Sequence, residues 1–263
     1  MTIDYGLMCI IMKALILAAG YATRLYPLTK EYPKPLLPVG QRPIADYIAE
    51  KIYKTKKIKE IIVVTNERFY KDFTIWSSDI CKKINLPVKV LSDGTKTEGD
   101  RLGAIGDINF ALTEASVNED IIVIAGDNLF EDDLSGFLGF SLNKSPRITI
   151  GVYDIKEKEK ASKYGVIKLD EENKITDFAE KPQKPQSSLV ATCLYYIPAG
   201  ALKFFRDYLA DSSNEHDAAG SFIGWLSKKE AVFGFVFSKR WYDIGDPVSY
   251  QEADRVFGED KIT

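Results

Sequence analysis

Cysteine and histidine are scarce in this sequence. The three cysteines (Cys9, Cys81 and Cys193) lie far apart without a CxxC pair, and His216 is the only histidine. An odd, scattered set of cysteines excludes a disulfide scaffold and a cysteine-rich zinc site, and it favours a reducing, cytoplasmic environment. A single histidine also excludes zinc centres that need several histidine ligands, and a Ser-His-Asp triad could use only His216.

Long apolar runs and an excess of one charge are lacking as well. No apolar stretch reaches the ~20 residues that span a bilayer, and the start of the chain lacks the basic segment of a signal peptide. The 35 Lys and Arg residues are balanced by 38 Asp and Glu residues, whereas non-specific nucleic-acid binding requires a basic surface. We therefore expect small-molecule partners, with no nucleic acid and no membrane.

The rest of the composition is that of a globular protein. Hydrophobic residues make up 45% of the 263 residues and charged residues 28%, which excludes disordered and fibrous classes. Met12 can serve as an alternative start. We therefore predict residues 1–11 to be an N-terminal extension and residues 12–263 to form a single domain.

Strand and helix patterns alternate along the first half of the chain. Continuous apolar runs are typical of strands buried in a parallel sheet, and helical periodicity separates them. The expected strands are 13–18, 60–65, 88–91 and 120–125, and the expected helices are 44–53, 69–81 and 102–112. This alternation predicts right-handed βαβ units, and therefore an α/β, Rossmann-like three-layer fold with a mainly parallel sheet.

The second half of the chain has strand patterns with little helix between them. Strands are expected at 147–153, 165–170, 174–178 and 189–196, and helices at 199–209, 221–228 and 248–257. Consecutive strands without crossover helices predict an antiparallel or mixed elaboration of the sheet.

Three segments follow predicted strands, where ligands bind in open α/β sheets: residues 19–25, 94–103 and 126–128. In the first segment, small residues let backbone N–H groups approach an anion, and Arg24 supplies a planar charged fork that suits phosphate. A tight turn with a surface arginine has the same pattern. The second segment is not a Walker loop, because Asp100 and Arg101 stand where that loop needs a lysine and a hydroxyl.

Prolines surround Lys34 in the segment YPKPLLPV. Pro33, Pro35 and Pro38 restrict the backbone, so Lys34 is held with little conformational freedom. A rigid lysine close to an anion loop suits a phosphate site, although a proline-rich loop with an exposed lysine remains the alternative.

Together, residues 17–39 (LAAGYATRLYPLTKEYPKPLLPV) resemble the signature of the sugar nucleotidyltransferases, LAxGxGTRLxPLTxxxPKxLLPV. Members of this family join a nucleoside triphosphate to a sugar 1-phosphate and release pyrophosphate. One departure is Ala22, which stands where many members have glycine. The resemblance implies that Arg24 and Lys34 are catalytic. It also implies nucleotide-binding roles for Ala18, Ala19, Gly20 and Thr23. Gly103, in the segment LGAIG (102–106), resembles the family glycine near the nucleotide base.

Later segments resemble the family in the same order. They are GDN (126–128), YGV (164–166), EKP (180–182), TCLY (192–195) and WYDIGDP (241–247). The resemblance implies that Asp127 and Asp243 hold Mg²⁺ and that Lys181 is catalytic through the sugar phosphate. It places Gly165, Glu180 and Thr192, with Lys181, at the sugar. Cys193 replaces a family glycine, and Asp246 replaces a threonine.

The base and the sugar stay open on sequence grounds. Transfer from dTTP or UTP to glucose 1-phosphate is favoured, and guanylyl transfer to mannose 1-phosphate or a non-catalytic, nucleotide-sugar-binding regulatory homologue are alternatives. A GT-A glycosyltransferase is disfavoured because no Asp-x-Asp occurs. The resemblance covers residues 12–257, which leaves no room for a C-terminal left-handed β-helix, and it implies that a homo-oligomer is possible.

Overall fold

The structure is a computed structural model that describes residues 11–217 and 219–259. Nearly all of the predicted extension at residues 1–11 therefore lies outside the described residues. No described helix is both long enough and apolar enough to cross a membrane.

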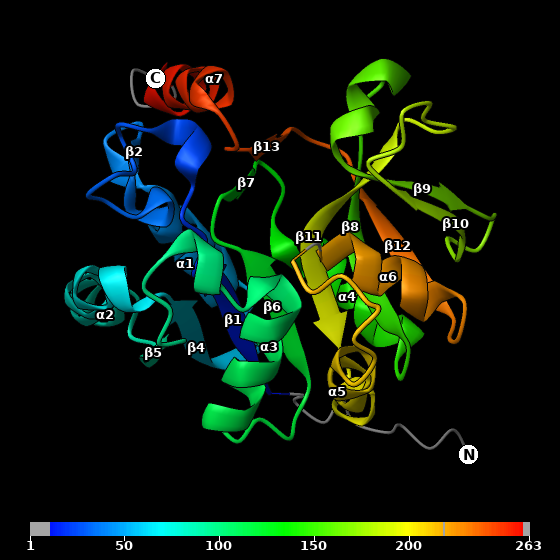
Figure 1. The fold of residues 1–263 in the computed structure, drawn as a ribbon, viewed down its shortest axis with the longest axis horizontal. Helices are drawn as coiled ribbons and strands as arrows, with labels where there is room; N and C mark the ends of the chain where they lie inside the picture. Colours follow the sequence, from blue (N-terminus) through cyan, green and yellow to red (C-terminus); the bar gives the residue numbers. More distant parts are fainter. Residues whose placement is uncertain (1–10, 218, 260–263) are drawn as a thin grey trace, which may run out of the picture.

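A nine-stranded mixed sheet forms the centre of the molecule (Figure 1). Four strands form its parallel half, with β1 between β4 and β6, and β5 beside β4. β11 joins this half to the rest, because one of its edges pairs antiparallel with β6 and, farther along the strand, with β9, while the other edge pairs antiparallel with β8. The strands are β1 (Met12–Ala18), β4 (Ile58–Thr65), β5 (Val88–Ser92), β6 (Ile121–Ala125), β8 (Ile148–Asp154), β9 (Gly165–Leu169), β10 (Ile175–Glu180), β11 (Leu189–Ile197) and β12 (Val232–Phe237).

Helices cover both faces of the sheet and give the three layers. α1 (Ile44–Lys54), α2 (Tyr70–Ile84) and α4 (Leu134–Lys144) pack on one face, and α3 (Gly103–Glu114), α5 (Lys203–Leu209) and α6 (Ala219–Ser227) pack on the other. The alternation of side chains along a strand produces the two cores: in β1, Ala14 and Ile16 face one core and Leu15 the other. The predicted α/β fold with an antiparallel elaboration is confirmed.

Smaller elements complete the fold around the carboxyl ends of the parallel strands. β7 (Asn128–Phe130) pairs with β13 (Trp241–Asp243), and β2 (Pro38–Val39) pairs with β3 (Arg42–Pro43). The last helix, α7 (Pro247–Glu259), packs on β2, and the Gly40 N–H donates to Asp254 Oδ1 at 2.8 Å.

Most elements predicted from the sequence lie within a few residues of their expected bounds. The helix expected at 199–209 is divided: a single 3-10 turn at Ala199–Ala201 precedes α5. The sequence analysis missed α4, β7, β12 and β13. In α4, Gly136 and Gly139 weaken helix propensity, so its pattern is poorly marked.

Candidate active site

Two carboxylates from distant parts of the chain meet where β7 pairs with β13. Asn128 is in register with Asp243, and the Ile244 N–H donates to the Asp127 carbonyl at 3.1 Å. Burial, followed by the nearby Asp127 carboxylate, raises the pKa of Asp243, while Lys34 and Arg24 oppose that rise. The two carboxylates therefore concentrate negative charge in a half-buried region, and Lys34 and Arg24 partly offset this charge.

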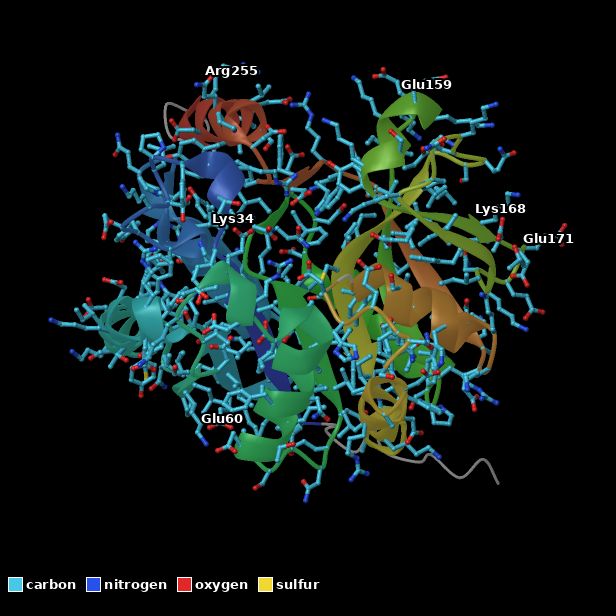
Figure 2. The ribbon with its side chains drawn as sticks, viewed as in Figure 1. Lys34, Glu60, Glu159, Lys168, Glu171 and Arg255 are labelled. Carbon is cyan, nitrogen blue, oxygen red and sulfur yellow. The ribbon has the colours of Figure 1, made fainter. Side chains whose placement is uncertain are left out.

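Lys34, which is labelled in Figure 2, contacts Asp127, one member of this carboxylate pair. Its Nζ forms an ion pair with Asp127 Oδ2, and the side chain is only 15% exposed. Pro33 and Pro35 flank it in a 3-10 turn, where the Leu37 N–H donates to the Lys34 carbonyl at 3.0 Å. The structure thus places Lys34 in a proline-flanked turn with its ammonium beside Asp127.

The GDN turn (residues 126–128) packs against the end of β1 and against the proline segment. The Gly126 N–H donates to the Leu17 carbonyl at 2.8 Å. A Cβ at Gly126 would lie 2.7 Å from that same carbonyl oxygen and 2.9 Å from Pro35 Cγ. Only glycine fits there, and this places Asp127 beside the proline segment that carries Lys34.

The loop that follows β1 (residues 19–25, the first loop) contains a residue in the left-handed backbone conformation that is not glycine. Ala22 has φ +49°, and its carbonyl accepts from the Thr29 hydroxyl at 2.7 Å. Ala18 and Ala19 are buried as whole residues, whereas a Cβ built on Gly20 would meet nothing within 4 Å. The Asn66 amide donates to the Ala19 carbonyl at 3.0 Å, which fixes the end of β1.

Arg24 extends toward the carboxylate pair. A Cβ built on Gly245 would lie 3.5 Å from Arg24 Nη2 and 3.6 Å from Asp243 Oδ2, so the guanidinium and the carboxylate flank the same glycine. Arg24, Lys34, Asp127 and Asp243 are thereby brought together, as the resemblance implies.

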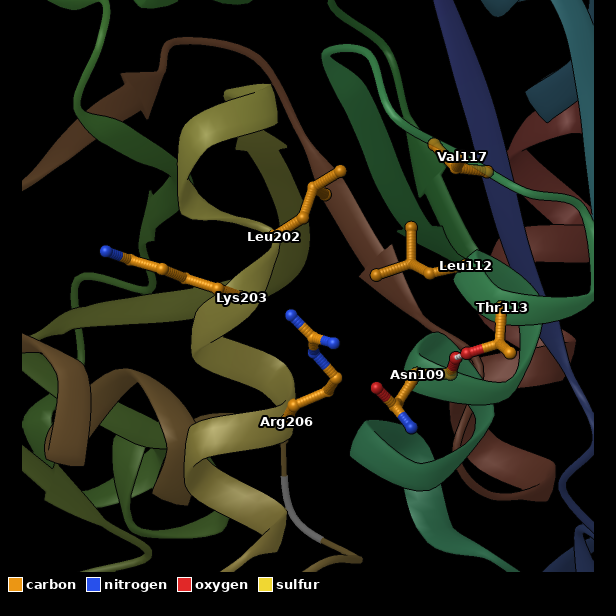
Figure 3. A pocket seen from close by; sticks show the side chains of 7 residues that line it. All are labelled: Asn109, Leu112, Thr113, Val117, Leu202, Lys203 and Arg206. Atoms are coloured by element: carbon orange, nitrogen blue, oxygen red, sulfur yellow. Dashed lines mark hydrogen bonds between the residues drawn. The ribbon is translucent and has the colours of Figure 1, made fainter.

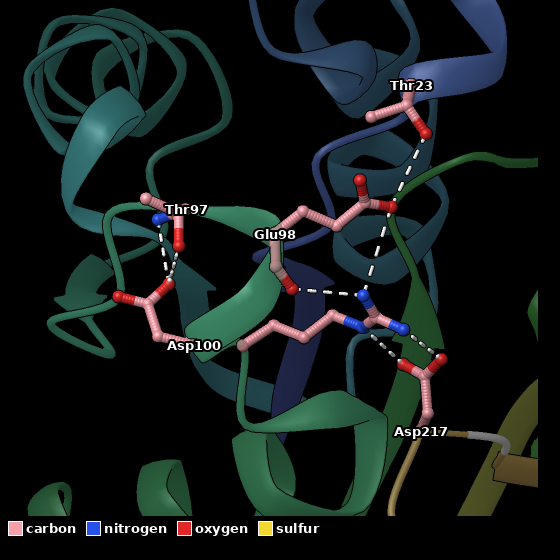
Figure 4. Close-up of polar contacts among 6 residues, drawn as sticks. Thr23, Thr97, Glu98, Asp100 and Asp217 are labelled. Atoms are coloured by element: carbon pink, nitrogen blue, oxygen red, sulfur yellow. Dashed lines mark hydrogen bonds and ion pairs between the residues drawn. The ribbon is translucent and has the colours of Figure 1, made fainter.

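Residues 97–101 form a short segment, called the strap here, that connects the first loop to the segment before α6 (Figure 4). The Thr23 hydroxyl donates to Glu98 Oε1 at 3.4 Å. The Arg101 guanidinium donates to both carboxylate oxygens of Asp217, at 3.1 and 2.9 Å. The sequence analysis missed Glu98 and Asp217, because no short motif links residues so far apart.

Gly103 begins α3 at the far end of this strap. It has φ +78°, and a Cβ would lie 2.6 Å from the His216 carbonyl oxygen. The Ile105 N–H donates to the same oxygen at 3.2 Å. Gly103 therefore serves the close packing of α3 on the segment before α6, next to the first loop.

The residues expected at the sugar gather on β9 and β10. Gly165 is in register with Glu180, and the Lys181 N–H donates to the Tyr164 carbonyl at 3.0 Å. Glu180 Oε2 is buried and has no hydrogen-bond partner in the described part of the chain. Burial raises the pKa of Glu180 more than neighbouring Lys181 lowers it. Lys181 has a side chain that is 63% exposed and an Nζ 3.7 Å from Glu180 Oε1.

Thr192 and Cys193 interrupt the ladder between β11 and β8. The Asn128 side-chain amide donates to the Thr192 carbonyl, and Thr192 as a whole residue is only 1% exposed. Thr192 thus presents almost no surface to a ligand in this structure. Cys193 has φ +49°, and burial, with the Asp127, Asp243 and Glu180 carboxylates contributing, raises the pKa of its thiol to about 12. Cys193 therefore stands between the carboxylate pair and the Glu180 region.

Asp246, the other departure from the family pattern, caps α7. Its Oδ1 accepts from the Ser249 N–H at 2.9 Å, while Ser249 Oγ accepts from the Asp246 N–H at 3.1 Å. The Ser249 N–H also lowers the pKa of Asp246. These reciprocal bonds form a helix N-cap, with Pro247 at the favoured first position.

A separate hollow of about 250 Å³ lies between α3 and α5 (Figure 3). Its lining comes from the C-terminal half of α3, including Leu112 and Thr113, and from Arg206 of α5. Because α3 runs antiparallel to the parallel strands it connects, this hollow lies at their amino ends, away from the carboxylate pair.

Comparison with known proteins places the chain in a family. Residues 13–259 match the family model described as nucleotidyl transferase. Among curated relatives, the bifunctional protein GlmU of Methanocaldococcus jannaschii is 30% identical over 245 residues, 93% of this chain and 54% of the relative. The glucose-1-phosphate adenylyltransferase of Fervidobacterium nodosum is 29% identical over 91% of this chain and 60% of the relative. The chain thus spans little more than half the length of these relatives.

A solved structure agrees with the fold. UDP-glucose pyrophosphorylase complexed with UDP-glucose has a TM-score of 0.80 at 22% identity, covering 95% of this chain and 99% of that one. With the family match across nearly all described residues, the protein belongs to the nucleotidyl transferase family, as the resemblance of its first loop to the sugar nucleotidyltransferases predicts.

Proposed function

We propose that the protein joins a nucleoside triphosphate to a sugar 1-phosphate and releases pyrophosphate. The first candidates are dTTP or UTP with glucose 1-phosphate. The observation that carries this proposal is the convergence of Asp127 and Asp243 with Lys34 and Arg24 at the carboxyl ends of the parallel strands. Family membership gives the reaction class its support.

The proposed reaction is in-line attack of a sugar 1-phosphate oxygen on the α-phosphorus of the triphosphate. The attacking oxygen is already ionised at neutral pH, so no general base is required. Because both substrates are anionic, catalysis depends on charge neutralisation and alignment, and alignment alone can contribute ~7–11 kcal/mol. Arg24 would stabilise the departing pyrophosphate, and Lys34 the α-phosphate.

The carboxylate pair fits a divalent cation. Burial and the neighbouring Asp127 carboxylate raise the pKa of Asp243, and a hard cation between the two carboxylates would offset this cost. Mg²⁺ commonly takes one or two carboxylates and completes its shell with phosphates and water. We therefore propose that Asp127 and Asp243 hold Mg²⁺, which when bound would offset charge on the phosphates.

The β9–β10 region would receive the sugar phosphate. The Lys181 ammonium is exposed and lies 3.7 Å from Glu180 Oε1, so it can turn from this long ion pair to a phosphate. The buried, unpaired Glu180 Oε2 would accept from a sugar hydroxyl, since a buried acceptor without a donor costs about 1–3 kcal/mol. Gly165 leaves the room that Glu180 needs: a Cβ there would lie 3.1 Å from Oε2.

The test is pyrophosphate release with Mg²⁺ over a matrix of substrates. Five triphosphates (dTTP, UTP, GTP, CTP and ATP) would be paired with the 1-phosphates of glucose, mannose, galactose and N-acetylglucosamine. Release confined to one or two pairs would support the proposal and identify the substrates; GTP with mannose 1-phosphate would select the guanylyltransferase alternative. Nucleotide-sugar binding without any release would favour a non-catalytic regulatory protein.

A further inference from the structure

Two acidic side chains outside the proposed catalytic set face each other beside the first loop. Asp93 follows β5, and Asp107 begins the second turn of α3 with only 7% of its surface exposed. The Asp107 carboxyl lies within hydrogen-bonding reach of Asp93. Neither Asp93 Oδ2 nor Asp107 Oδ1 has a hydrogen-bond partner in the described chain, although both oxygens are buried.

A shared proton satisfies both oxygens. Two carboxylates in contact cannot both ionise cheaply, so one remains a neutral acid and donates to the other. Burial, then the Asp93 carboxylate and the more distant Asp217, raises the pKa of Asp107 to about 8. Arg101, the cation of the strap, is engaged with Asp217. The proton therefore belongs on Asp107, and the acceptor is Asp93 Oδ2.

The other oxygen of Asp93 holds a turn. Asp93 Oδ1 accepts from both the Thr95 N–H and the Thr95 hydroxyl, each at 2.8 Å. Thr95 is buried, and its hydroxyl oxygen accepts from the Tyr21 hydroxyl at 3.3 Å. Tyr21 belongs to the first loop and is itself buried. The Tyr21 hydroxyl thus donates to Thr95, and the Thr95 hydroxyl donates to Asp93.

We propose that Asp107 is a positioning residue for the nucleoside triphosphate: as a neutral acid it fixes Asp93, and through Thr95 it holds Tyr21 and the first loop in the shape that binds the nucleotide. The assignment of a nucleotide to this loop rests on the proposed function. The hydrogen-bond series itself does not. When Asp107 loses its proton, two adjacent carboxylates repel, and the turn at Thr95 is released.

Amide substitutions test where the proton lies. In Asp107→Asn, an N–H replaces the acid as donor, whereas Asp107→Ala has no donor. We expect Asp107→Ala to raise the KM for the nucleotide at least tenfold with kcat changed less than threefold, and Asp107→Asn to restore KM to within threefold of the wild type. Equal effects of the two substitutions would overturn the proposal.

The pH profile supplies a readout that a purely structural role would not move. The wild-type KM for the nucleotide should rise at least threefold from pH 7 to pH 9 beyond any change in Asp107→Asn. Asp93→Asn should abolish the same rise, because its amide N–H can donate to an ionised Asp107. A wild-type profile that coincides with those of both amide variants would contradict the shared proton. Asp93→Asn also keeps the test available if Asp107→Ala does not fold.

Hydrogen–deuterium exchange of the ligand-free protein separates this inference from the proposed function. At pH 7, amides at residues 20–23 and 93–97 should exchange at least fivefold faster in Asp107→Ala than in the wild type or Asp107→Asn. This result would support the positioning role even if no substrate pair releases pyrophosphate. Unchanged exchange in Asp107→Ala would exclude the role even in an active enzyme.

Discussion

The proposed phosphate end and the proposed sugar end of the candidate active site are built in opposite ways. At the phosphate end, Lys34 is paired with Asp127, and glycine fits only at position 126 because backbone and proline atoms close around it. At the sugar end, Glu180 keeps an unpaired buried oxygen, and Lys181 is exposed. A phosphate group is common to every substrate of such a reaction, so the residues that bind it can be fixed in place before the substrate binds. The residues proposed to bind the sugar instead keep a polar atom without a hydrogen-bond partner until a ligand supplies one.

Removing a charge at the phosphate end should have the largest effect. Lys34→Ala or Asp127→Ala should lower kcat by on the order of 10²–10³, as loss of one preorganised electrostatic group does. Circular dichroism and steady-state pyrophosphate release would measure folding and rate. Lys30→Ala, an exposed lysine in the same loop, is the matched control; a Lys34→Ala enzyme as fast as this control would remove Lys34 from catalysis.

Adding one carbon at the start of α3 should be next in size. Gly103→Ala combines φ +78° with a Cβ 2.6 Å from the His216 carbonyl oxygen, and such overpacking costs roughly 1–3 kcal/mol. Urea unfolding would show a lower midpoint. Gly99→Ala meets only Thr97 Oγ1 at 3.8 Å and should be near neutral. Equal midpoints for the two variants would show that α3 can shift away from His216.

Opening the sugar end should change selectivity more than rate. Cys193→Gly removes a side chain between the carboxylate pair and Glu180, and it relieves the left-handed backbone at φ +49°. We expect the ratio of kcat/KM for N-acetylglucosamine 1-phosphate to that for glucose 1-phosphate to rise about tenfold, the size of a one-group steric effect. Cys81→Ala, on α2, should leave the ratio unchanged. An unchanged ratio in Cys193→Gly would place the thiol outside the sugar pocket.

The smallest effect is expected in the first loop. Ala22→Gly should stabilise the protein by about 0.5 kcal/mol, because relief of the left-handed strain exceeds the added freedom of the unfolded chain. Ala104→Gly, within α3, should instead destabilise by about 0.5–1 kcal/mol. Paired urea titrations would decide: destabilisation by both substitutions would mean that Ala22 carries no strain.

The same contrast explains what could be predicted from the sequence. Continuous apolar strands and the contiguous run around Arg24 and Lys34 are local signals, so the parallel half and the phosphate end were expected. Short pieces such as β13 and the glycine-containing α4 acquire their structure from tertiary packing. The cap formed by Asp246 is a local pattern that could have been recognised, because an aspartate before proline with serine three residues on is a helix start. The Asp93–Asp107 contact could not have been recognised from the sequence, because no local pattern distinguishes either residue from a solvent-exposed acidic residue.

β11 also has a mechanical consequence. Because this strand is hydrogen-bonded to β6 of the parallel half and to β8 and β9 of the other half, the two ends of the active site share one continuous backbone ladder. The sheet resists hinge-like separation, since opening it would break several backbone hydrogen bonds at once. Any widening of the site must come from twisting of the sheet and from movement of the loops at its edge. The phosphate end and the sugar end are therefore expected to move together.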